Sequence, residues 1–95
     1  MQLRFSGPVT FWKGPSPWHF VPIPDEESEL IASNANDLTY GWGCIPVRAT
    51  IRSTTFSTSL FPKDGIYMLP VKTDVRRSAG VDLGDVVDVT MDLGA

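Results

Sequence analysis

The chain has 95 residues, which is enough for one small domain, residues 1–95, and too few for a second. With 42% hydrophobic and 20% charged residues and a mean hydropathy of -0.02, it has the composition of a folded domain rather than of a disordered segment. Eight Lys and Arg against eleven Asp and Glu give a net charge of -3. This balance counts against a nucleic-acid partner, because phosphates are bound by clustered cations.

The sequence contains one cysteine and one histidine. An internal disulfide is therefore excluded, and so are the usual zinc sites built from Cys and His, so we expect no metal and no cofactor. No stretch of about 18 apolar residues is present, and residues 1–7 lack the apolar core of a signal peptide. We expect a cytoplasmic protein with no membrane partner.

The first part of the chain predicts two strands and a helix. Apolar residues between 3 and 12 indicate an opening strand, and residues 18–23 form a second apolar run. A helix is expected over about 25–34, because acidic residues in a first turn favour the helix dipole. This helix would bury Leu30 and Ile31.

The rest of the chain predicts four further strands and a second short helix. Strands are expected over residues 45–51 and 87–93, where apolar and polar residues alternate, and over residues 56–61 and 66–71, which each follow a turn. Pro62–Gly65 has the composition of a turn. Lys72–Ala79 fits two helical turns, and Gly80 stands where a left-handed helix cap is expected.

The two halves of the sequence share one order of elements: a strand, a proline exit, a helix, a glycine and a strand. Residues 20–24 are similar in this way to residues 67–71, and residues 43–47 to residues 84–87. The pattern predicts an all-β fold: a small closed Greek-key or double-split β-barrel with two short capping helices. Closure would remove the exposed edges of the short strands.

Three stretches carry a resemblance to a known family. They are Trp18–Val21, Gly41–Gly43 running into the strand 45–51, and Thr58–Pro62 together with Tyr67–Lys72. This ordered set resembles the bacterial family DUF1905, a domain of unknown function. The resemblance implies a double-split β-barrel distantly similar to AbrB-like transition regulators, and it implies no activity.

Five residues are candidates for binding a ligand at the barrel end. His19 is the only side chain that titrates near neutrality without help, so it is either a general base or anion donor or a hydrogen-bonded structural histidine. Arg48 interrupts an apolar strand, where a cation needs a salt bridge or a polar cavity. Trp42, between two glycines, either covers a cavity mouth or plugs the barrel. Tyr40 and Lys72 complete the set.

Other aromatic and basic residues are interpreted structurally. Trp12 and Trp18 lie in apolar runs and are expected in the core. Arg76 and Arg77 follow each other on the second short helix, so they are expected to form a solvated face. None of these four residues is placed in the candidate site.

These observations predict a binding or interaction module that takes a small anionic or aromatic ligand, or a protein partner. Two alternatives remain open: a small cofactor-free enzyme, similar to an isomerase or cyclase, that uses the barrel mouth, and an AbrB-like DNA-binding or antitoxin-like regulator. The acidic balance disfavours the regulator. Because one chain carries both halves of the barrel, we expect a monomer or a weak dimer.

Overall fold

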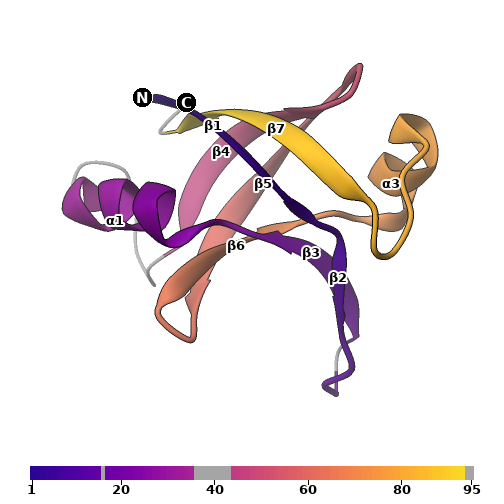
Figure 1. Ribbon diagram of the computed structural model, residues 1–95, viewed down its shortest axis with the longest axis horizontal. Coiled ribbons are helices and arrows are strands. Elements are labelled where there is room, and N and C mark those ends of the chain that lie inside the picture. The colour runs from indigo at the N-terminus through magenta and orange to yellow at the C-terminus, as the bar shows by residue number, and fades with distance from the viewer. Residues whose placement is uncertain (16, 36–43, 94–95) are drawn as a thin grey trace.

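The computed structural model describes residues 1–15, 17–35 and 44–93, and its ribbon is drawn in Figure 1. Seven strands and two principal helices follow each other along the chain. They are β1 (Gln2–Pro8), β2 (Thr10–Trp12), β3 (Trp18–Pro22), α1 (Asp25–Ser33), β4 (Ile45–Ile51), β5 (Thr54–Lys63), β6 (Ile66–Pro70), α3 (Thr73–Ala79) and β7 (Val86–Leu93).

The strands form one curled antiparallel sheet in the order β1-β7-β4-β5-β6-β3-β2. The mostly β class with two short helices is thus confirmed, whereas the closed double-split barrel is not. Within the described residues, β1 pairs only with β7 and β2 only with β3. The two strands at the ends of this order are nevertheless consecutive in the chain, with Val9 alone between them.

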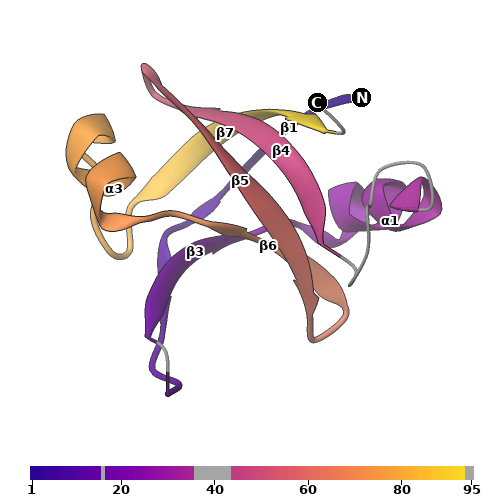
Figure 2. The same ribbon diagram turned by 180° about the vertical axis from the view of Figure 1, so that it is seen from behind.

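The pairing of strands relates the two halves of the chain by an approximate twofold. The long strand β5 pairs with β4 along Thr54–Leu60 and with β6 along Phe61–Lys63. The stretch formed by β1 and β2 behaves in the same way, since its first part pairs with β7 and its second part with β3. The helices α1 and α3 then lie at opposite sides of the curled sheet, as Figures 1 and 2 show.

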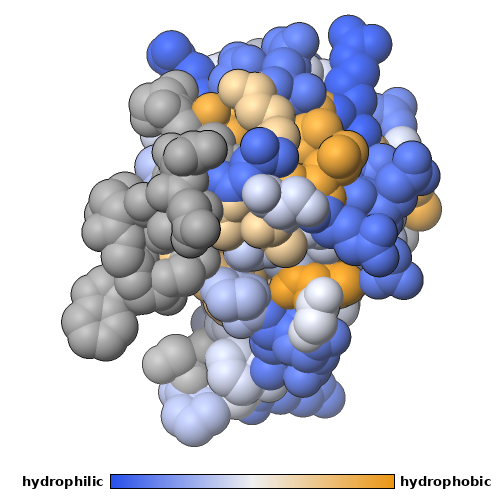
Figure 3. All heavy atoms as spheres, turned by 90° about the vertical axis from the view of Figure 1, so that its left-hand side faces the viewer, coloured by the Kyte–Doolittle hydropathy of each residue, from blue (hydrophilic) through white to orange (hydrophobic). Residues whose placement is uncertain are grey.

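The core is filled by one face of nearly every strand. In β7, residues 87, 89, 91 and 93 are buried while residues 86, 88 and 92 are exposed, as the alternation predicts. On α1, Ile31 is fully buried, but Leu30 is 45% exposed, so its predicted burial is wrong. Viewed from the side of α1, the apolar surface is broken up by hydrophilic residues (Figure 3).

Residues with positive φ mark a helix cap and a tight turn of the chain. Gly80 ends α3 with φ of 67°, as predicted for a left-handed cap. The turn between β5 and β6 is shorter than predicted, because Pro62 and Lys63 belong to β5. Only Asp64 and Gly65 form it, both with positive φ, which suits a two-residue hairpin.

Candidate functional site

A cavity of about 600 Å³ lies where the start of β3, the end of β5 and the passage from β6 into α3 meet. We call it the α3 cavity. Its walls are mostly apolar, formed by Phe11, Pro17, Trp18, Phe61, Pro70 and Val71. Its polar lining consists of His19, Lys72, Thr73 and Arg76. An apolar recess with a few convergent polar groups is the usual form of a small-molecule site.

Aromatic rings hold one another in place along the wall of the α3 cavity. The ring centroid of Trp18 lies 4.6 Å from those of Phe20 and Phe61, and that of Phe11 lies 4.7 Å from the His19 ring. Trp12 stands edge-on to Trp18 at 6.2 Å. Because Trp12 is 39% exposed, its predicted place in the core is wrong.

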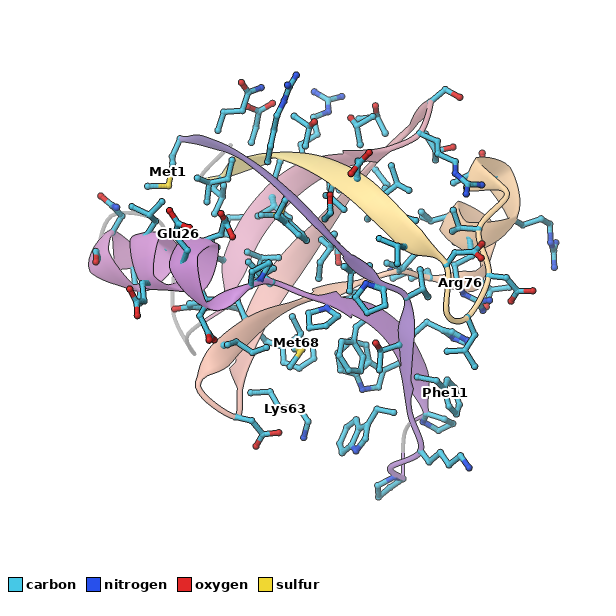
Figure 4. All side chains as sticks on the ribbon, in the orientation of Figure 1. Met1, Phe11, Glu26, Lys63, Met68 and Arg76 are labelled. Carbon is cyan, nitrogen blue, oxygen red and sulfur yellow. The ribbon has the colours of Figure 1, made fainter. Side chains whose placement is uncertain are left out.

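Arg76 supplies the cationic side of the cavity from the middle of α3. Its Nη2 donates a hydrogen bond of 3.2 Å to Oγ1 of Thr73, one turn earlier on the same helix. Its Nε is buried and has no hydrogen-bond partner in the part of the chain that the structure describes. A buried donor without an acceptor is costly. Figure 4 shows Arg76, from α3, and Phe11, from β2, on the same side of the molecule.

His19 enters the cavity from β3 with an altered acidity. Burial lowers the pKa of His19 below its ordinary value of 6.5, and the positive charge of Arg76 lowers it further, while Asp82 acts in the opposite direction. The imidazole is therefore neutral at pH 7, with one ring nitrogen free to accept a proton or a hydrogen bond.

The structure brings some of the residues expected in the site together and separates others. His19 and Lys72 both line the α3 cavity. Arg48 lies elsewhere, exposed in β4 opposite Asp92 of β7. The premise that Arg48 is a buried cation is thus wrong, because the strand alternates and turns this position to the outer face. Tyr40 and Trp42 lie outside the described residues.

The described residues offer neither a metal cluster nor a membrane-crossing helix. No three His, Cys, Asp or Glu side chains of residues 1–15, 17–35 and 44–93 are grouped so that they could hold a metal ion. None of the helices in these ranges is long and apolar enough to cross a membrane.

A family model described as a domain of unknown function, DUF1905, matches residues 5–91. The chain belongs to the DUF1905 family. The resemblance drawn from the sequence is thereby confirmed at the level of the family, and the matched DUF1905 range contains the whole α3 cavity, from Phe11 to Arg76. A search of curated proteins found no match.

Within this DUF1905 domain, Trp18 and Arg76 line the cavity although the sequence predicts neither in the site, and Arg76 is the charged one of the two. It was interpreted as part of a solvated helix face, yet it is half-buried. A signal was present, because Val75 and Ala79 form the inner side of the helix, and a residue three before Ala79 lies at the border of that side. Helical spacing alone places Arg76 beside the core but does not reveal a cavity there.

Proposed function

We propose that the chain is a binding module that takes a small molecule with an aromatic body and an anionic group in the α3 cavity. The observation that carries the proposal is Arg76, which lines a recess with aromatic walls and whose buried Nε has no acceptor among the described residues. A carboxylate in the cavity would pair with the guanidinium of Arg76 through charge-assisted hydrogen bonds and neutralise its charge.

The walls of the cavity favour an aromatic body over an aliphatic one. Trp18, Phe61 and Phe11 present half-buried rings whose partners fix their orientation. Aromatic pairs gain about 0.5–1.5 kcal/mol beyond the area that they bury. A flat ligand can therefore extend a stack that already exists, at little cost in side-chain ordering.

The charges at the cavity favour an anion although the whole chain is acidic. Lys72 and Arg76 line the α3 cavity, whereas no Asp or Glu is among the lining residues. The neutral His19 adds no charge of its own. The charged residues of the lining are therefore both cations although the net charge of the chain is -3, and they favour acids over their neutral analogues, while the carboxylate of Asp82 lies outside the lining.

The proposal is tested with two probes of nearly the same shape, one a carboxylate and the other the corresponding neutral amide. We expect 3-phenylpropionate to bind more tightly than 3-phenylpropanamide, by about tenfold at low salt, since a hydrogen bond to a charged group is worth about 1.5–3 kcal/mol. In Arg76→Met the preference for the acid is lost. Arg77→Met is the matched control, because Arg77 is the exposed neighbour on the same helix. Equal binding of both probes to the wild type, or of neither, would refute the proposal.

A second candidate function is supported by the state of His19. A neutral imidazole beside a cation in an apolar recess is suited to take a proton from a carbon next to a carbonyl. We expect phenylpyruvate, an aromatic keto acid, to exchange its C3 protons for deuterium faster with the wild type than with His19→Gln. If NMR finds equal exchange rates while phenylpyruvate still binds, the chain is a binding module and not an enzyme of this kind.

We also propose that the barrel is closed, that the protein is cytoplasmic and that its partner is not a nucleic acid. The closed barrel is supported by the single residue that separates β1 from β2. A cytoplasmic location is supported by the presence of one cysteine, because a chain with one cysteine forms no internal disulfide and disulfides are rare in cytosolic proteins. The net charge of -3 supports a partner other than nucleic acid.

A further inference from the structure

The strands β3 and β6 pair with each other and are related by the approximate twofold. Equivalent hydrogen bonds are therefore found at the two ends of this pair. The N–H of Ile23 donates to the carbonyl of Tyr67 at 2.9 Å, and the N–H of Val71 donates to the carbonyl of His19 at the same distance. Tyr67 and His19 therefore occupy equivalent positions, as do Ile23 and Val71. In a regular antiparallel ladder each of these pairs would exchange a second bond in the reverse direction.

The two helices begin in equivalent ways after these strands. The N–H of Ser28 donates to the carbonyl of Pro24 at 2.8 Å in α1, and the N–H of Arg76 donates to the carbonyl of Lys72 at 2.9 Å in α3. Pro24 directly follows Ile23, just as Lys72 directly follows Val71. Ser28 in the first half thus corresponds to Arg76 in the second.

In the first half, the second bond would run from the N–H of Tyr67 to the carbonyl of Ile23, and the hydroxyl of Ser28 lies between these two groups instead. Its Oγ accepts a hydrogen bond of 3.1 Å from the N–H of Tyr67 and donates one of 2.9 Å to the carbonyl of Ile23. Ser28 is buried, and its one side-chain oxygen provides hydrogen bonds to both backbone groups, which water does not reach there.

In the second half, the side chain at this position is Arg76, which turns to Thr73 instead. The structure gives no hydrogen bond between the N–H of His19 and the carbonyl of Val71, and no side chain of the described residues bridges them. His19, Val71 and Arg76 all line the α3 cavity. The position that the Ser28 hydroxyl fills in one half therefore belongs to the cavity in the other.

We propose that the ligand of the α3 cavity is an aromatic hydroxy acid, whose hydroxyl bridges the His19 N–H and the Val71 carbonyl while its carboxylate meets Arg76. This inference rests on the proposed function and adds the substrate class. One atom must both accept from an amide and donate to a carbonyl, which a hydroxyl does and a carboxylate or an ammonium does not. The fold itself supplies the precedent in Ser28.

The test compares two acids that differ only by a hydroxyl, 3-phenyllactate and 3-phenylpropionate. We expect one enantiomer of 3-phenyllactate to bind about fivefold to tenfold more tightly than 3-phenylpropionate. The reason is that its hydroxyl exchanges two hydrogen bonds with water for two hydrogen bonds with the protein backbone. If 3-phenylpropionate binds and neither enantiomer binds more tightly, water suffices at this position, and the hydroxy-acid inference fails while the proposed function stands. If neither acid binds, both fail.

Two variants at one position separate the hydroxyl from the charge. Arg76→Ser places a hydroxyl where Ser28 has its own, so we expect the preference for 3-phenyllactate to disappear. Arg76→Ala removes the same cation without adding a hydroxyl, and it should keep the preference at a lower affinity for both acids. Equal preference in the two variants would overturn the inference.

A measurement without ligand checks the same geometry. In Arg76→Ser the amide proton of His19 should exchange with solvent more slowly than in Arg76→Ala, because the new hydroxyl accepts its hydrogen bond. The amide of Tyr67, which Ser28 already protects, should exchange equally in both variants. An unchanged rate at His19 would show that the two positions are not equivalent.

Discussion

Arg52, in the turn between β4 and β5, binds Gly80 at the end of α3. Its Nη1 donates to the carbonyl of Gly80 at 2.5 Å and to that of Ala79 at 3.3 Å. The last carbonyls of a helix have no partner within the helix, and a cation there also complements the helix dipole. The turn therefore fixes the short helix that carries Arg76 into the cavity.

We expect Arg52→Met to lower the free energy of unfolding by about 1–2 kcal/mol, because two charge-assisted hydrogen bonds to carbonyls are lost. Arg48→Met is the matched control, since Arg48 is an exposed arginine of the neighbouring strand β4, and its effect should stay below about 0.5 kcal/mol. Urea denaturation of both variants measures the difference. Equal losses would mean that Arg52 does not anchor α3.

Replacing Ser28 by Ala should cost about 1–3 kcal/mol of unfolding free energy, because the Tyr67 N–H and the Ile23 carbonyl are left buried without a partner. Ser33→Ala provides the control on the same helix. The Ser33 hydroxyl bonds the carbonyl of Glu29 but is exposed, so water replaces it and the loss should be below about 0.5 kcal/mol. Thermal unfolding of the two variants decides whether the inserted hydroxyl stabilises the ladder.

The pKa of His19 should rise in Arg76→Met. Burial holds this pKa below 6.5 and would continue to do so, but the repulsion by the guanidinium would be gone. NMR titration of the imidazole Cε1 proton measures the pKa in both proteins. A pKa that stays the same or falls would show that the charge of Arg76 does not reach the ring.

The same lowered pKa makes stability depend on pH in a defined direction. Between the lowered folded pKa and pH 6.5, the unfolded chain binds more protons at His19 than the folded chain, so a falling pH stabilises the unfolded state relative to the folded one. The contribution of His19 to the free energy of unfolding is therefore fully present above pH 6.5 and is lost as the pH falls toward the pKa of His19 in the folded chain. His19→Gln should be less sensitive to pH in this window, and urea midpoints between about pH 5 and 7 test this.

The sequence predicted the strands better than the places where they end. The alternation in β7 identified its inner face, because only one face of that strand is buried. Pro62 was predicted in a turn but belongs to β5. Pro62 lies opposite Tyr67 in the pairing of β5 with β6. The N–H of Tyr67 donates to Ser28 and its carbonyl accepts from Ile23, so neither group is directed at Pro62. The absence of an N–H on Pro62 therefore removes no hydrogen bond from the ladder.

The candidate site was only partly accessible to prediction. His19 stands out because its chemistry is unique in this chain, and Lys72 because it is one of the few basic residues that could meet an anionic ligand. Arg48 was chosen because a cation in an apolar strand looks buried, yet a strand with one wet face carries such residues outward. Arg76 is not found in this way because the cavity depends on how α3 packs against β5 beside the start of β3, which local sequence does not encode.

The last prediction concerns the state of association, since one chain supplies both related halves. The passage from β1 to β2 is held by the turn before β7: the N–H of Val9 donates to the carbonyl of Asp85 at 2.9 Å, and the N–H of Gly84 donates to the carbonyl of Val9 at 2.8 Å. Val9 is itself 1% exposed. Val9 links the two end strands of the sheet order through the chain itself, and these bonds hold Val9 in place, so no second chain is needed to connect the two ends.

We therefore expect the folded chain to be a monomer whose melting temperature is the same at about 1 μM and at about 100 μM, since only an oligomer gains stability by mass action. Sedimentation equilibrium over the same range should give the mass of one chain. Val9→Ala is a useful companion variant. It should lower the melting temperature at every concentration alike, because it removes buried methyl groups from within one molecule. A melting temperature that rises with concentration, together with a dimer mass, would mean that a second copy completes the sheet.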